Sequence, residues 1–130
     1  MWDFIVSMMP YALAFTAPML VTALGGLFSE RSGVVNIGLE GLMIVGSFTT
    51  ALFINQFYAG NDSIIWIGIL LGGVAGCAFS LLHAYASINL KADQVISGTA
   101  INLLAPAVTI FLASTLTGSQ NISIVKGVSR

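Results

Sequence analysis

The stretch that decides the fold class is Ile64–Ile88, IIWIGILLGGVAGCAFSLLHAYASI, which contains no Asp, Glu, Lys or Arg. A helix with a rise of about 1.5 Å per residue needs about 20 residues to cross a bilayer core of ~30 Å. Three further apolar stretches occur at about Phe4–Phe28, Leu39–Phe57 and Val95–Leu116, and the second is the shortest. We therefore predict an all-α, polytopic membrane protein with about four transmembrane helices and a glycine-rich break between the first two.

The composition indicates the same class. Of 130 residues, 57% are hydrophobic and 7% are charged, whereas about a quarter of the residues in a soluble domain are charged. The net charge of −1 excludes the basic surface of a nucleic-acid-binding protein. The stretch Phe4–Phe28 exceeds the about 7–15 apolar residues of a signal peptide, so we expect a retained span. Because no spacer is long enough for a second domain, residues 1–130 are expected to form one transmembrane unit.

Small residues recur every four positions in the third stretch, at Gly68, Gly72, Gly76 and Ser80. This spacing places them on one face of a helix, where small side chains let two helices approach closely in lipid. We predict a helix-packing face. A sliding surface in a moving transporter is the alternative that the pattern leaves open.

Polar residues concentrate in Ser29–Gly41, between the first two stretches. Glu40 lies one residue inside the second stretch, and a charge in mid-bilayer costs roughly 2.5–3.5 kcal/mol. Glu40 is therefore expected either at the interface or facing a wet interior, and Asn36 lies in the same segment. The alternative is an ordinary glycine-rich turn with a surface pair between Glu30 and Arg31.

A second polar stripe enters the fourth stretch, where Gln94, Gly98 and Asn102 lie four residues apart. Pro106 lacks a backbone N–H, so the carbonyl of Asn102 loses its helical partner and a kink is expected. A wet cavity could use the amides of Gln94 and Asn102. Alternatively, Asn102 bonds a neighbouring helix, as is common in membranes.

Three isolated residues carry weaker signals. His83 lies one turn from the end of the third stretch, which contains no acidic residue, so we favour a hydrogen-bonded structural or interfacial role over a proton relay. Cys77, the single cysteine, forms no disulfide framework and is expected to pack inertly. Pro18 is expected to free a carbonyl in the first helix.

Phosphate-binding glycine-lysine loops and zinc-binding His-Glu-x-x-His motifs are absent from the sequence.

Two motifs carry a family resemblance. Arg31–Met43, RSGVVNIGLEGLM, and Lys91–Ala105, KADQVISGTAINLLA, occur in this order about 50 residues apart. Both closely resemble segments of ABC importer permeases of the nucleoside and simple-sugar branch, which is related to the ribose and branched-chain amino-acid permeases. The resemblance implies a non-enzymatic subunit that translocates nucleosides or related sugars across a bacterial plasma membrane. By the same resemblance, the residues that line or brace the path are Asn36, Glu40, Gln94 and Asn102.

The resemblance also implies partners. These are an ABC ATPase subunit that uses ATP, a second permease subunit and an extracytoplasmic substrate-binding lipoprotein, with no cofactor or metal in the permease itself. Family permeases are roughly twice as long or longer, so we expect an N-terminal part of a permease that does not couple ATP hydrolysis to transport alone. The exact substrate and the membrane orientation are not set by the sequence.

Two other function classes remain open at this stage. A secondary transporter or small channel would use ionisable residues inside the spans, and Glu40 and His83 come nearest to this pattern. A structural membrane protein would oligomerise through the face that contains Gly68, Gly72 and Gly76.

Overall fold

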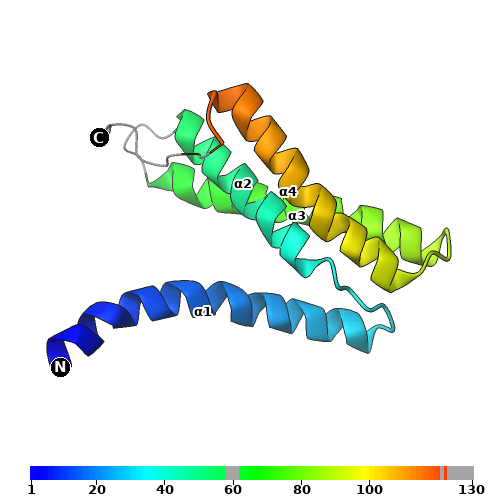
Figure 1. Cartoon of the computed structure of the whole chain (residues 1–130), viewed down its shortest axis with the longest axis horizontal. Helices are drawn as coiled ribbons and strands as arrows, with labels where there is room; N and C mark the ends of the chain where they lie inside the picture. The colour runs from blue at the N-terminus through cyan, green and yellow to red at the C-terminus, as the bar shows by residue number, and fades with distance from the viewer. Residues whose placement is uncertain (58–61, 121, 123–130) are drawn as a thin grey trace. The chain divides into compact units, whose positions relative to one another are not determined.

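The computed structural model describes residues 1–57, 62–120 and 122. These residues form four α-helices, shown in Figure 1: α1 (Trp2–Arg31), α2 (Leu39–Phe57), α3 (Ser63–Ile88) and α4 (Gln94–Thr117). The prediction of an all-α chain with a break between its first two helices is confirmed.

Three of these helices are long and apolar enough to cross a membrane, by length and composition. They are α1, α3 and α4, with mean hydropathies of 1.7, 2.2 and 1.9. The second helix, α2, has 19 residues and is not among the three. Its first turn contains Glu40 and its last turn contains Asn55 and Gln56, and these side chains lower its hydropathy.

The chain divides into two compact units, residues 1–36 and residues 37–130, which we describe separately. The first unit consists of α1 and the turn that follows it. None of the residues in α1 is buried. The helix continues through Pro10 and Pro18, and Thr22 Oγ1 donates to the carbonyl of Pro18 at 2.8 Å. The carbonyl that loses its helical N–H partner at Pro18 is that of Ala14, four residues earlier, so the Thr22 bond does not replace the lost one.

The turn after α1 is closed by its own hydrogen bonds. The hydroxyl of Ser29 donates to the carbonyl of Val34 at 2.7 Å, and the N–H of Val34 donates to the carbonyl of Ser29 at 3.3 Å. Gly33 adopts a positive φ of 86° between them. A left-handed residue at this place ends a helix, and glycine takes that conformation without steric cost.

The second unit is a bundle in which α2 packs against both α3 and α4 (Figure 1). Glycines allow α2 and α3 to cross closely. A Cβ on Gly72 would lie 2.6 Å from the carbonyl oxygen of Gly46, and Thr50 Oγ1 donates to the carbonyl of Gly68 at 3.1 Å. In lipid the hydrophobic effect does not drive helices together. Close contact between the two backbones instead stabilises the helix pair through van der Waals packing.

Not every small residue of the predicted packing face is buried. Gly68 and Gly72 are buried against α2. Gly76 is partly buried, and an added Cβ would stand 3.5 Å from the carbonyl of Leu42. Ser80 is also partly buried, and its hydroxyl donates within α3 to the carbonyl of Cys77 at 2.8 Å.

The two ends of α4 are capped by neighbouring residues. The carboxylate of Asp93 accepts from the N–H groups of Val95 and Ile96 at 2.8 and 3.2 Å. At the other end Gly118 adopts a positive φ of 71°, and its N–H donates to the carbonyl of Ser114. Aspartate before a helix and left-handed glycine after it are favoured helix ends. Residues 119, 120 and 122 then follow α4.

Candidate site at the start of α2

The side chain of Asn102 joins α4 to the start of α2. Its Nδ2 donates to the carbonyl of Ile37 at 2.9 Å, and its Oδ1 accepts from the N–H of Gly41 at 2.8 Å. Only one orientation of the carboxamide places a donor at the carbonyl and an acceptor at the N–H, so the network fixes that orientation. Asn102 thereby satisfies an N–H in the first turn of α2, which has no partner within its own helix.

Two glycines let the backbones come close enough for these bonds. A Cβ on Gly98 would lie 2.9 Å from the backbone nitrogen of Gly38, and a Cβ on Gly41 would lie 2.8 Å from the carbonyl oxygen of Ile101. Real Cβ atoms do not approach backbone atoms this closely. The glycines of the two sequence motifs therefore face each other, and the stripe that contains Gly98 and Asn102 is a contact between helices.

Glu40 lies in the first turn of α2, beside this contact. Its side chain is exposed, and its carboxylate forms no hydrogen bond or ion pair with any of the described residues. The positive end of the helix dipole favours a carboxylate at this position. The structure thus presents a carboxyl group at the end of an apolar helix, without a partner among the described residues.

Gln94 and Asn36 are the other two predicted site residues. Gln94 is the first residue of α4 and is partly buried. It precedes Asn102 by eight residues, which corresponds to about 12 Å along a helix axis. Asn36, also partly buried, is the last residue of the first unit. The assignment of all four residues to a substrate path stays a prediction.

His83 is buried near the end of α3, with 3% of its surface exposed. Its Nδ1 lies 3.1 Å from the hydroxyl of Ser97 in α4, so it joins the two helices near the short connection between them. Its Nε2 and the hydroxyl of Ser87, one turn later, are buried without a hydrogen-bond partner. No group of three or more His, Cys, Asp or Glu side chains in the described residues could hold a metal ion.

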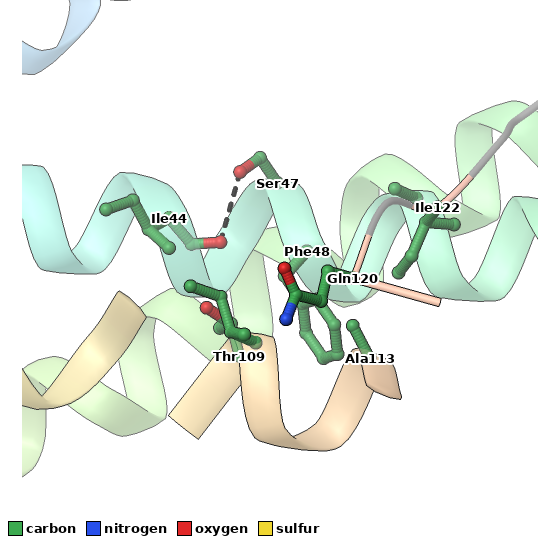
Figure 2. Close-up of a pocket in the computed structure, with 9 residues that line it drawn as sticks. Ile44, Ser47, Phe48, Thr109, Ala113, Gln120 and Ile122 are labelled. Atoms are coloured by element: carbon green, nitrogen blue, oxygen red, sulfur yellow. Dashed lines mark hydrogen bonds between the residues drawn. The ribbon is translucent and has the colours of Figure 1, made fainter. Parts of the chain in front are cut away.

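A pocket of about 250 Å³ lies farther along the contact between α2 and α4. Figure 2 shows the residues around it, with the Gln120 carboxamide between Thr109 and Phe48. The walls are otherwise mainly aliphatic. Sequence reasoning missed this pocket, although Ser47 and Thr109 are polar residues inside apolar stretches and gave a signal for it.

Comparisons with known proteins agree with the two motifs. The family model for the branched-chain amino acid transport system permease component matches residues 8–129. The guanosine ABC transporter permease protein NupQ of Bacillus subtilis is 51% identical over 111 residues, which are 84% of this chain and 34% of that protein. The nucleoside ABC transporter permease protein NupC of Lactococcus lactis is 44% identical over 114 residues, 86% of this chain and 36% of that protein.

A third relative names a different solute. The putative glucose ABC transporter permease protein TsgC13 of Haloferax volcanii is 41% identical over 96 residues, 74% of this chain and 28% of that protein. The chain thus spans about a third of the length of these curated relatives. No solved structure matches it significantly. The resemblance inferred from the motifs is confirmed, and the chain belongs to the permease component family of branched-chain amino acid transport systems.

Proposed function

We propose that this chain is part of the membrane permease of an ATP-driven importer of nucleosides. Two of its relatives are named as permeases for guanosine and for nucleosides, at 51% and 44% identity. The permease supplies the path across the membrane. ATP is bound and hydrolysed by a separate ATPase subunit, and a second permease subunit and an external substrate-binding lipoprotein complete the importer.

The similarity to these two relatives carries the transport assignment, and the placement of Glu40 supports the assignment of a residue that lines the path. Ionisable residues in membrane helices commonly mark paths for polar solutes, and Glu40 stands in the first turn of the apolar helix α2. Glu40 is exposed and has no partner among the described residues. Its oxygens accept hydrogen bonds from the hydroxyl and amino groups of a passing nucleoside. We therefore propose Glu40 as a path-lining residue.

Asn102 has a different role in this proposal. Both ends of its carboxamide are engaged with Ile37 and Gly41. It is a positioning residue, because it holds the first turn of α2 and so the backbone that carries Glu40. Gln94 and Asn36, each partly buried, are also proposed to line the path.

Uptake measurements test the proposal in cells that carry the complete importer. Labelled guanosine uptake is compared between wild type and Glu40→Gln at equal amounts of permease in the membrane. We expect Glu40→Gln to lower the uptake rate at least about tenfold, which corresponds to the loss of a charge-assisted hydrogen bond. The control is Asp62→Asn, since Asp62 is exposed and its side chain caps no backbone group of α3.

Two results would count against the proposal in different ways. Wild-type cells that take up no guanosine or other nucleoside would overturn the transport assignment. Normal uptake by Glu40→Gln, in cells whose wild-type counterpart imports guanosine, would overturn the role of Glu40 and leave the transport assignment standing.

A further inference from the structure

We propose that the pocket between α2 and α4 holds the planar base of the transported nucleoside. This inference rests on the proposed function and adds a second contact region, along the helix from Glu40. The pocket is formed by Ile44, Ser47 and Phe48 of α2, by Thr109 and Ile110 of α4, and by Gln120 (Figure 2).

The size of the pocket suits a ligand of this kind. Pockets for drug-sized ligands occupy about 300–1,000 Å³, and this one occupies about 250 Å³. This volume is large enough for a small ring system. A carrier that must release its cargo also requires a modest contact area.

The walls match a flat aromatic ligand. Phe48 is half-buried and supplies an aromatic ring. Stacking on an aromatic side chain tolerates any base, because every base has a π-face. Ile44 and Ile110 add aliphatic surface from the two helices. Apolar walls of this kind do not satisfy the many hydroxyls of a free sugar, so they favour a base over a sugar.

The polar groups suit the edge of a base. The hydroxyl of Ser47 donates to the carbonyl of Ile44 at 3.0 Å, and that of Thr109 donates to the carbonyl of Ala105 at 2.9 Å. Their protons are used within the helices, so their oxygens can serve a ligand only as acceptors. The carboxamide of Gln120 offers both a donor and an acceptor, and it bonds to none of the described residues.

Substitutions of Phe48 test whether the base stacks on its aromatic ring or only packs against an apolar side chain. Phe48→Leu keeps an apolar side chain but removes the aromatic face, whereas Phe48→Tyr keeps that face. Guanosine uptake by the complete importer is measured over a range of concentrations. We expect Phe48→Leu to raise the KM for guanosine about tenfold and Phe48→Tyr to stay within about twofold of wild type. The matched control is Phe53→Leu, because Phe53 also lies in α2 but outside the pocket and contacts Phe57.

Gln120 provides a test that does not involve helix packing. Because Gln120 is exposed and follows the end of α4, Gln120→Ala should leave the amount and thermal stability of the permease unchanged. We expect it to raise the KM for guanosine several-fold. Excess unlabelled ribose should compete poorly with guanosine in wild type if the pocket selects the base.

The outcomes distinguish this inference from the proposed function. If wild type imports guanosine and both Phe48→Leu and Gln120→Ala keep its KM, the pocket does not hold the base. Strong competition by ribose would likewise contradict a base site. If wild type imports no nucleoside, the proposed function fails and this inference fails with it.

Discussion

Asn102 accepts a hydrogen bond from the backbone N–H of Gly41, 61 residues earlier in the chain, at 2.8 Å. The same side chain donates to the carbonyl of Ile37. The first turn of α2 is thus capped by a side chain from another helix. This contact joins the two sequence motifs that carry the family resemblance, Arg31–Met43 and Lys91–Ala105.

Asn102→Ala should destabilise the permease, because it leaves the buried N–H of Gly41 and the carbonyl of Ile37 without these partners. An unsatisfied buried group costs about 1–3 kcal/mol. The measurement is the apparent Tm of the detergent-solubilised permease. Thr99→Ala is the control, since the Thr99 hydroxyl donates only within α4, to Val95. Equal Tm values for the two variants would contradict the capping role.

Gly72 and Gly73 should respond oppositely to alanine. A Cβ on Gly72 would lie 2.6 Å from the carbonyl oxygen of Gly46, whereas a Cβ on Gly73 would meet nothing within 4 Å. Gly72→Ala must push α2 and α3 apart, at a cost of about 1–3 kcal/mol. Gly73→Ala should be neutral or stabilising by up to about 1 kcal/mol, because alanine favours a helix. Thermal stability of the two variants checks the difference, and a tolerated Gly72→Ala would refute the close crossing.

His83 should tolerate asparagine better than leucine. Asparagine places a polar atom near the position of Nδ1, where it can keep the bond to Ser97, and it removes the unpaired Nε2. Leucine leaves the Ser97 hydroxyl without this partner, at a cost of about 1 kcal/mol. We expect a Tm for His83→Asn close to that of wild type and a lower Tm for His83→Leu. A lower Tm for His83→Asn than for His83→Leu would contradict a stabilising bond between residue 83 and Ser97.

Gly33 should accept asparagine more readily than valine. Its φ is 86°, and a Cβ at this position would meet nothing within 4 Å, so the cost of substitution is conformational and not steric. A left-handed conformation costs an ordinary L-residue about 1–2 kcal/mol, while asparagine tolerates it. The Tm should therefore fall in the order wild type, Gly33→Asn, Gly33→Val. Similar Tm values for all three would indicate that the turn after α1 rearranges freely.

The helices could be predicted from the sequence because apolar length is a local property. The second helix has the predicted bounds, Leu39–Phe57. The first was predicted as about Phe4–Phe28 and continues to Arg31, because apolar runs mark the bilayer core and helices continue into the polar interface. The fourth span was predicted as about Val95–Leu116. The structure has one continuous helix there, Gln94–Thr117, with Pro106 inside it.

The contacts of the site could be predicted only in part. The spacing of Gly98 and Asn102 placed both on one face of a helix, which needs no knowledge of the fold. The partner of that face could not be predicted, because periodicity identifies a surface and not what covers it. The bond from Asn102 to Gly41 and the pocket at Phe48 both depend on how two helices pack. The roles of Glu40 and Gln94 stay predictions.

The long-range cap on α2 has a consequence for biosynthesis. Ribosomes add about 5–20 residues per second, so the 61 residues between Gly41 and Asn102 take roughly 3–12 s to synthesise. During that interval the newly inserted α2 lacks the cap that α4 later provides. A chain that stalls before residue 102 therefore leaves the N–H of Gly41 without this side-chain partner.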